Sequence, residues 1–242
     1  MSLVLEKVAL KLGGRDLVKD ISLTMEPGEV VGLLGPNGAG KTTTFNLVIG
    51  LLKPDAGQVY LDGQPVKNLS MPNRARLGVG YLPQEPSVFR QLTVRQNLDL
   101  ALSQSHLSPS HCRLRREELI DDFHLSAFLE RRGYQLSGGE RRRCEVARAL
   151  AVGRVGPRYL LLDEPFAGVD PLAVSELQNL IQKLRKRGMG ILITDHNVRE
   201  TLAITARSYI LNDGCILSSG PSKEVAGDPL VRRHYLGEDF RL

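Results

Sequence analysis

The stretch Glu29–Thr42 reads EVVGLLGPNGAGKT, and it decides the fold. A continuous apolar run, typical of a fully buried strand, ends at Gly35, and a helix is expected from Lys41 to Ile49. The glycines between them let the backbone wrap closely around an anion, and the N–H groups at the helix start supply a positive cradle. The G-x-x-x-x-G-K-T pattern between a strand and a helix therefore predicts a phosphate-binding loop rather than a chance glycine-rich turn.

A second apolar strand ends in two adjacent carboxylates, in the stretch RYLLLDEP at residues 158–165. Ligands of a parallel α/β sheet bind at the carboxyl ends of its strands. Successive side chains of a strand point to opposite sides, so Asp163 and Glu164 are expected to have different roles. We predict that Asp163 binds Mg²⁺ and that Glu164 acts as a general base on a water molecule that attacks the bound phosphate. Ordinary surface acids at a strand end are the alternative.

The composition of the 242-residue chain is that of a globular protein, with 42% hydrophobic and 24% charged residues. The net charge of +5 is compatible with nucleic acid, an anionic membrane or a polyphosphate ligand, and it selects none of them. No apolar run approaches the ~20 residues of a membrane helix and no signal-peptide pattern is present, so we expect a protein inside the cell. Three widely spaced cysteines without a CxxC argue against disulfides or a zinc ribbon.

Predicted strands and helices alternate along the chain, except in one helical stretch. Leu92–Leu102 and Leu114–Arg132 carry leucines at helical spacing, and a polar connector, SQSHLSPSH, lies between them at 103–111. Weak alternation at Leu3–Leu10 indicates an edge or hairpin strand. The sequence predicts an α/β core with an antiparallel β edge, interrupted by a helical insertion.

Three further strings carry a family resemblance. LSGGE at 136–140 falls between the phosphate loop and the DE pair, Gln84 lies in YLPQ, and Asp195–His196 follow the strand ILIT. Over essentially the whole chain, this set resembles the nucleotide-binding subunit of an ATP-binding cassette (ABC) transporter. The resemblance implies one P-loop NTPase domain at 1–242. Its RecA-like core would span about 1–85 and 155–220, its helical subdomain about 90–152 and its C-terminal tail about 221–242.

The resemblance also implies a role for each matching residue. Ser137, Gly138 and Gly139 would contact the γ-phosphate of a nucleotide held by a second subunit, and the turn Ala167–Asp170 would cross the dimer. The catalytic residues would be Glu164, His196 and Gln84, and the Mg²⁺ ligands would be Thr42, Gln84 and Asp163. The residues that bind ATP would be Leu12, Gly35, Pro36, Asn37, Gly38, Ala39, Gly40, Lys41, Thr42, Thr43, Ser137, Gly138, Gly139 and Glu140.

One position departs from the family pattern. The family usually places an aromatic residue before the phosphate loop to stack on adenine, whereas this chain has Leu12 in the segment LKLGGR. Adenine would then rest on an apolar surface. Such contact is less selective in geometry than ring stacking.

Within the family, the chain is most similar to ATPases of lipopolysaccharide-export systems. The similarity includes YLPQEPSVFRQLTV, LSGGERRR, LLDEPFAGVDP, ITDHNVRETL and the terminal YLGEDFRL. It implies a homodimer bound peripherally to the cytoplasmic face of the inner membrane, under two integral membrane subunits and without nucleic acid. The apolar loop at Val88, Phe89 and Arg90 would accept a short helix of those subunits, or it would be a buried packing cluster. The terminal segment would be a frayed tail, or it would fold back on the core or support dimerisation.

Other functions remain open at this point. The nearest alternative is the ATPase of a branched-chain amino acid or other solute transporter, whose chemistry would be identical. A nucleic-acid-associated ABC ATPase and an ATP-gated module without hydrolysis are the rivals from other classes. The basic run Arg141–Arg143 is expected to be solvated or paired with carboxylates rather than to contact nucleotide.

Overall fold

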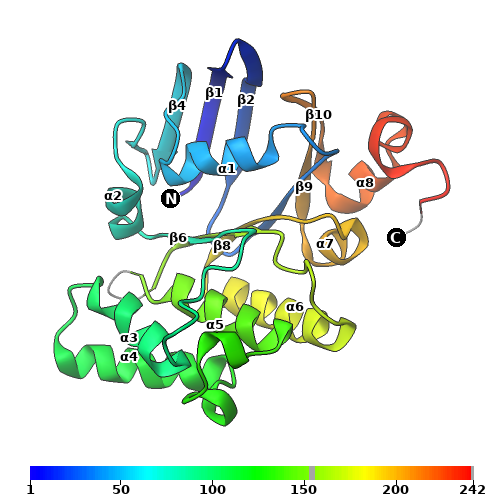
Figure 1. Cartoon of the computed structure of the whole chain (residues 1–242). Coiled ribbons are helices and arrows are strands. Elements are labelled where there is room, and N and C mark those ends of the chain that lie inside the picture. Colours follow the sequence, from blue (N-terminus) through cyan, green and yellow to red (C-terminus); the bar gives the residue numbers. More distant parts are fainter. Residues whose placement is uncertain (153–155, 241–242) are drawn as a thin grey trace.

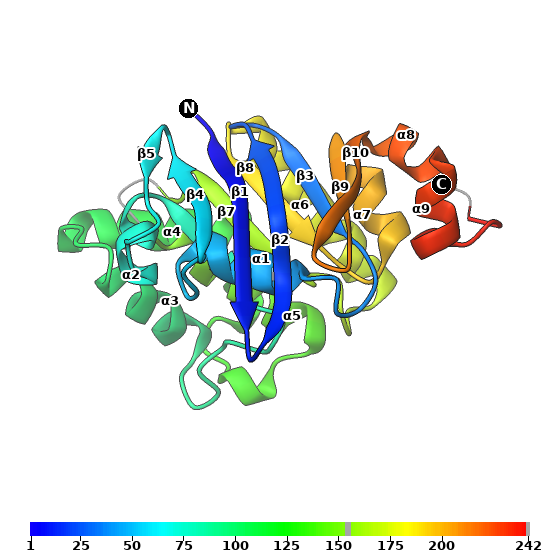
Figure 2. The ribbon, with the colours of Figure 1, turned by 90° about the horizontal axis from the view of Figure 1, so that it is seen from above.

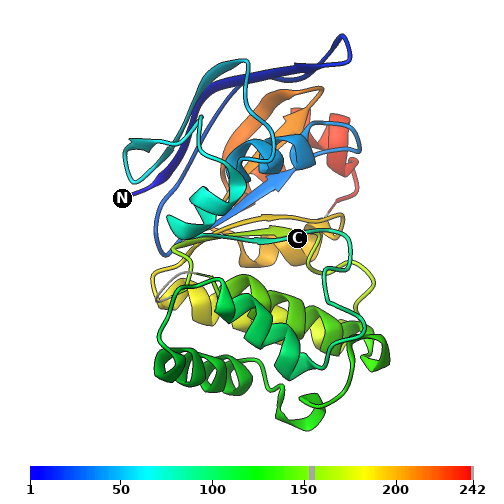
Figure 3. The same ribbon diagram turned by 60° about the vertical axis from the view of Figure 1, so that its left-hand side comes forward.

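The computed structural model describes residues 1–152 and 156–240, arranged in three layers. An antiparallel sheet lies over α1 (Lys41–Ile49), a mixed sheet runs through the middle, and a group of helices covers its other face (Figure 1 and Figure 3). The predicted restart of the core at residue 155 and the last two residues of the tail, 241–242, lie outside the described residues.

The middle sheet consists of β3 (Val30–Leu34), β6 (Val79–Leu82), β7 (Tyr159–Asp163), β8 (Gly190–Thr194), β9 (Arg207–Asn212) and β10 (Cys215–Pro221). Its strand order is β10-β9-β3-β8-β7-β6. The strands from β9 to β6 pair in parallel, and only β10 runs antiparallel to its neighbour. The carboxyl ends of β3, β7 and β8 therefore meet at one edge, which brings the phosphate loop and the acidic pair together.

The second sheet has the order β2-β1-β4-β5 and is antiparallel throughout, as the sequence predicted for the edge of the fold. Its strands are β1 (Leu3–Leu12), β2 (Arg15–Met25), β4 (Ala56–Leu61) and β5 (Gln64–Pro65). Seen from above, β1 and β2 pass over α1 (Figure 2). The helix that follows the phosphate loop is thus enclosed between two sheets.

The helices below the middle sheet are α3 (Val94–Ser103), α4 (Pro109–Asp122), α5 (Gly138–Leu150) and α6 (Pro171–Lys186), with single turns at Ser126–Phe128 and Gly133–Gln135. The remaining helices are short: α2 (Met71–Arg76), α7 (Val198–Ile204), α8 (Ser222–Gly227), α9 (Pro229–Val231) and a π-type turn at Arg232–Leu236. Among the described residues, no helix combines the length and the apolar character needed to cross a membrane.

The helix α4 differs from the sequence expectation of Leu114–Arg132. It begins five residues earlier, because the side chain of Ser108 caps it and Pro109 occupies its first turn, where a missing N–H costs nothing. It also ends earlier, since the chain turns at His124, which has a φ of 50°. The leucines beyond that point belong to short turns.

Alternating side chains of the middle strands form two separate cores. On β7, Leu160 and Leu162 face the helices below, whereas Leu161 faces α1. This period of two is what a strand buried on both faces requires. Phe45 of α1 is fully buried in the upper core and fills the space between the two sheets.

The C-terminal segment folds back onto the core. Tyr235, Leu236 and Phe240 pack against a third cluster that contains Leu34 of β3 and Ile210 of β9. Of the three possibilities left by the sequence, the described residues adopt the segment folded back on the core and not the frayed tail, and a role in dimerisation stays a prediction.

Replacing Phe45 by alanine is expected to lower the free energy of unfolding by about 3–5 kcal/mol, because it leaves a cavity between two sheets that cannot collapse. Urea denaturation of the nucleotide-free chain measures this loss. The matched control is Leu114→Ala on α4, whose side chain is 62% exposed and whose loss should stay within roughly 0.5 kcal/mol. Equal effects of the two substitutions would contradict the placement of Phe45.

Candidate active site

The phosphate loop forms a tight turn from the end of β3 to the start of α1. Gly35, Gly38 and Gly40 all have positive φ, at 148°, 79° and 102°. A Cβ at Gly35 would lie 2.1 Å from the carbonyl oxygen of Leu211, and one at Gly40 would lie 2.6 Å from that of Leu17. Neighbouring backbone therefore excludes any side chain at these two positions.

The start of α1 is open to a ligand. Its N-cap, Gly40, makes no side-chain capping bond, so the first helical N–H groups are available to an anion. Thr42 is exposed and Thr43 half-buried in this first turn, and Asn37 and Gly38 are exposed at the tip of the loop. Pro36 is half-buried and Ala39 buried, so they support the loop from behind.

The Lys41 ammonium lies inside the loop. Its Nζ donates to the carbonyl oxygens of Gly35 at 2.8 Å and Pro36 at 3.0 Å. Burial lowers the pKa of Lys41, and the charges of Glu164 and Asp163 oppose that shift. The cation is therefore held close to both carboxylates at the sheet edge.

The carboxylate of Glu164 contacts the other two residues that the family resemblance predicts to be catalytic. Gln84 Nε2 donates to Glu164 Oε2 at 2.9 Å, and His196 Nε2 lies 2.7 Å from Glu164 Oε1. Glu164 is 7% exposed, whereas Gln84 and His196 are exposed. The three residues come from the ends of different strands of one sheet and form a single cluster.

Asp163 ends β7 and is 1% exposed. Burial, and next the charge of Glu164, raises its pKa to about 6. Tyr81 donates a long hydrogen bond of 3.4 Å to Oδ2, while Oδ1 is buried with no partner among the described residues. An unpartnered buried carboxylate oxygen fits a divalent cation.

The donor set at this edge suits Mg²⁺ in particular. Among the described residues, no cluster of three His, Cys, Asp or Glu side chains could form a cage for a metal. Mg²⁺ is usually bound through one or two carboxylates, phosphate oxygens and water, and it does not need such a cage. Asp163 and the hydroxyl of Thr42 could supply the protein ligands.

Arg142 was not identified by the sequence as part of this site. It is 7% exposed, and its guanidinium donates to the carbonyl oxygens of Asp163, Glu164 and Pro165 at 3.0, 2.6 and 3.1 Å. It also pairs with Glu145 at 3.1 Å. Glu164 has a φ of 50°, which is unusual for a residue with a side chain, and Arg142 holds the backbone in that conformation.

Asp195 is a second residue whose role the sequence did not specify. Its buried carboxylate accepts hydrogen bonds from the backbone N–H groups of Phe166 and Asn197, both at 2.8 Å. The two hydrogen bonds fix the backbone next to catalytic candidates, because Phe166 lies two residues after Glu164 and Asn197 directly follows His196. The position of Asp195 directly before His196 was the available signal.

The LSGGE segment lies at the start of α5, in the helical layer. Ser137 is the N-cap, its Oγ accepts from the N–H of Glu140 at 3.2 Å, and the Glu140 carboxylate accepts from the N–H of Ser137 at 2.9 Å. Cβ atoms at Gly138 and Gly139 would lie 3.0 Å from the Gly168 carbonyl oxygen and from Ala173 Cβ. The glycines thus allow α5 to pack against the turn after the acidic pair.

Ser137 and the phosphate loop lie in different layers of the chain. Ser137 begins α5 below the middle sheet, and the loop begins α1 above it (Figure 3). The structure does not bring Ser137 to the nucleotide loop of its own chain.

Leu12 ends β1 with its side chain 56% exposed, so it is available to an apolar ligand surface.

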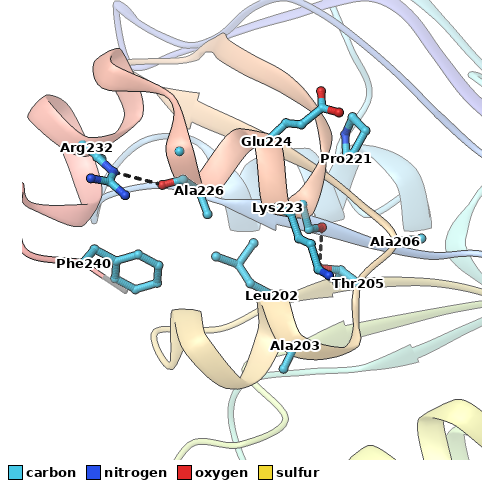
Figure 4. Close-up of a pocket in the computed structure, with 12 residues that line it drawn as sticks. Leu202, Ala203, Thr205, Ala206, Pro221, Lys223, Glu224, Ala226, Arg232 and Phe240 are labelled. Carbon is cyan, nitrogen blue, oxygen red and sulfur yellow. Dashed lines mark hydrogen bonds between the residues drawn. The ribbon is translucent and has the colours of Figure 1, made fainter. Parts of the chain in front are cut away.

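A cavity of about 720 Å³ lies away from this site, between α7, α8 and the C-terminal segment. Figure 4 shows Leu202, Lys223, Arg232 and Phe240 around it, with Arg232 donating to the carbonyl oxygen of Ala226. None of the predicted site residues lines it. The cavity therefore has no part in the chemistry of the strand-edge cluster.

Comparison with known proteins places this geometry in a family. Residues 18–167 match the family model described as ABC transporter. The chain belongs to the ABC transporter family. The predicted fold class and the family resemblance are both confirmed, and ATP binding follows from membership of this family.

Two curated relatives of this ABC protein have the same name. The lipopolysaccharide export system ATP-binding protein LptB of Acidithiobacillus ferridurans is 54% identical over 228 residues, which cover 94% of this chain and 93% of the relative. LptB of Escherichia coli (strain K12) is 50% identical over 242 residues, which cover 100% of this chain and 99% of the relative.

Solved structures of ABC cassettes have the same fold. A nucleotide-free ATP-binding cassette from an ABC transporter matches with a TM-score of 0.87 and 27% identity, over 98% of this chain and 100% of that one. A dimeric cassette in a post-hydrolysis state, bound to ADP and Pi, matches with a TM-score of 0.79 and 26% identity, over 91% and 98% of the two chains.

The raised pKa of Asp163 makes a prediction about stability. Its pKa is about 6 in the folded chain, against 3.8 for an ordinary aspartate. Between these values the folded chain holds more protons than the unfolded one, so the free energy of unfolding falls as the pH rises. Asp163→Asn should therefore stabilise the nucleotide-free chain in EDTA, by an amount that grows by roughly 1–2 kcal/mol between about pH 4.5 and 7.

Urea denaturation of both proteins at each pH measures this difference. A stabilisation that is constant with pH, or that shrinks as the pH rises, would contradict the burial of an unpaired charge at Asp163.

Proposed function

We propose that this chain is the ATP-hydrolysing subunit of a transporter that exports lipopolysaccharide. The observation that carries the ATPase assignment is the Glu164 carboxylate, held between Gln84 and His196 at the sheet edge that also carries the phosphate loop. The observation that supports the cargo is the 50–54% identity to proteins named for lipopolysaccharide export, over nearly the full length of this chain and of each relative.

Glu164 is the general base of the proposed reaction. It orients the attacking water and takes its proton as the water adds to the γ-phosphate. Gln84 and His196 fix the direction of the carboxylate, and the Arg142 bonds to the carbonyl oxygens of Asp163 and Glu164 fix the backbone that carries it. Lys41 and the N–H groups of α1 stabilise the charge on the phosphate oxygens.

Asp163, Thr42 and Gln84 would hold Mg²⁺ in this site. When bound, the metal ion would neutralise part of the negative charge on the phosphate oxygens. The unpartnered Oδ1 of Asp163 would face the cation, and the Lys41 ammonium would face the polyphosphate.

A homodimer completes the proposed site. Ser137 and the start of α5 would form a second anion site near an exposed surface. The capping box occupies the N–H groups of Ser137 and Glu140, whereas those of Gly138 and Gly139 lie in the first turn and have no partner within the helix. This site lies in a different layer from the phosphate loop of the same chain, so the loop would receive it from a second copy. The dimeric cassette with ADP and Pi that this fold matches is consistent with such a pairing.

The proposed docking surface for membrane subunits is the loop at Phe89 and Arg90. Both are exposed, and Phe89 is 46% exposed, whereas Val88 is buried in the helical core and supports the loop from below. The Arg148 guanidinium lies 4.8 Å from the centre of the Phe89 ring and donates to the Ser87 carbonyl oxygen. A cavity of about 420 Å³, lined in part by Ser87, Arg148 and Tyr81, opens beside it and suits a short apolar helix.

This docking would place the chain on the cytoplasmic face of the inner membrane, where ATP is available. The importer of a branched-chain amino acid or another solute is the alternative, since its ATP chemistry would be the same. The 50–54% identity to export ATPases, which extends over nearly the whole chain, favours lipopolysaccharide as the cargo.

The catalytic assignment predicts that Glu164→Gln binds ATP with near wild-type affinity and hydrolyses it at least ~100-fold more slowly, because a general base is lost. The variant should also accumulate as an ATP-bound dimer in size-exclusion chromatography. Phosphate release measures the turnover, and Lys41→Ala serves as the control that loses binding itself. Near-normal turnover of Glu164→Gln would remove Glu164 from its role.

The cargo and the docking surface are tested together by purification of the tagged chain from native membranes. Two integral membrane subunits of a lipopolysaccharide exporter should co-purify with it, and Phe89→Ala should lose most of them because the aromatic anchor is gone. Leu100→Ala, with a similarly exposed side chain at 41%, is the matched control and should retain them. Co-purification of amino-acid importer subunits would refute the proposed cargo.

A further inference from the structure

Arg74 is a buried cation that the proposed chemistry does not use. It lies in α2 and is 1% exposed, and burial lowers the pKa of its guanidinium to about 10 with no acidic neighbour contributing. A buried charge without a counter-ion is costly unless its donors are satisfied. Its contacts should therefore explain why the chain places it there.

The guanidinium joins two separate backbone segments. Nη1 donates to the carbonyl oxygens of Leu47 at 2.6 Å and Val48 at 2.7 Å, in the last turn of α1. Nε donates to Leu69 at 3.1 Å and Nη2 to Lys67 at 3.3 Å, both in the loop before α2. The last carbonyls of a helix have no partner within it, and a cation there is favoured by the helix dipole. Arg74 therefore caps the C-terminal end of α1.

The space for this cap depends on Gly50, the residue that follows α1. Gly50 has a φ of 81°, and a Cβ there would lie 2.7 Å from Arg74 Nε and 2.9 Å from the Leu69 carbonyl oxygen. A side chain at position 50 would displace the guanidinium. The glycine and the arginine thus form one fitted contact.

We infer that Arg74 is a positioning residue for nucleotide binding. α1 has 9 residues, with the phosphate loop at one end and Arg74 at the other. At 1.5 Å per residue this is a rod roughly 13 Å long, so a shift of its far end is passed to Lys41 and to the N–H groups that face phosphate. The cap fixes the end of α1 that the nucleotide itself does not touch.

The position of α2 gives this contact a second consequence. Ile49 at the end of α1 and Met71 and Ala75 of α2 line the cavity in which we place a helix of the membrane partner. A partner that presses on α2 would act on the phosphate loop through Arg74 and α1. This consequence rests on the proposed function.

The test compares ATP binding by three variants of the full chain, at a temperature well below their unfolding. Arg74→Met removes the donors and keeps apolar bulk, and Arg74→Lys keeps the charge without the planar fork. Titration with a fluorescent ATP analogue should give a Kd raised roughly 10- to 100-fold in Arg74→Met, the cost of a small misplacement of binding groups, and an intermediate Kd in Arg74→Lys. Arg76→Gln is the control, because Arg76 is exposed on the same helix and bonds to Asn73.

The outcomes separate positioning from folding. If Arg74→Met unfolds at a lower temperature but its folded form binds ATP like the wild type, the inference is overturned. If the wild-type chain binds no ATP, the proposed function fails instead. Should Arg74→Met not fold, Gly50→Ala takes its place, since it displaces the guanidinium without removing it; a raised Kd supports the inference, and a wild-type Kd refutes it.

Discussion

A helix that binds a multiply charged anion at its N-terminal end must not move when the anion arrives. In this chain that helix is α1, and contacts along its length and at both of its ends fix its position. Phe45 and its neighbours fix the helix between two sheets, Gly35 and Gly40 allow the loop to press against backbone on either side, and Arg74 caps the far end. The phosphate loop is a local feature, but its rigidity comes from contacts with segments distant in the sequence.

The acidic end of β7 is the second feature that depends on this arrangement. Asp163 and Glu164 are buried beside one another, and the charge of Glu164 at close range disfavours the ionised form of Asp163. The charges of Arg142 and Lys41 relieve that repulsion, and Mg²⁺ held at the unpartnered oxygen of Asp163 would relieve it further. Such a site would suit a cation that binds together with phosphate.

The separation of the two anion sites explains why one chain would not act alone. The serine–glycine start of α5 packs against the turn at Ala167–Asp170, which begins three residues after Glu164. The same turn thus connects Glu164, the proposed general base, to the surface that would face a second copy. This connection gives the proposed dimer a physical means of sensing whether the γ-phosphate is present.

The family resemblance added Gln84 and His196 to the predicted site. The sequence by itself determined the local chemistry of the phosphate loop and of the acidic pair at a strand end. These features depend on glycine spacing and on strand ends, which neighbouring residues specify. It did not distinguish Arg142 from Arg141 and Arg143, because only the packing of α5 decides which of three identical side chains turns inward. The early end of α4 and the burial of Arg74 were likewise decided by the tertiary structure, since both depend on contacts with segments far along the chain.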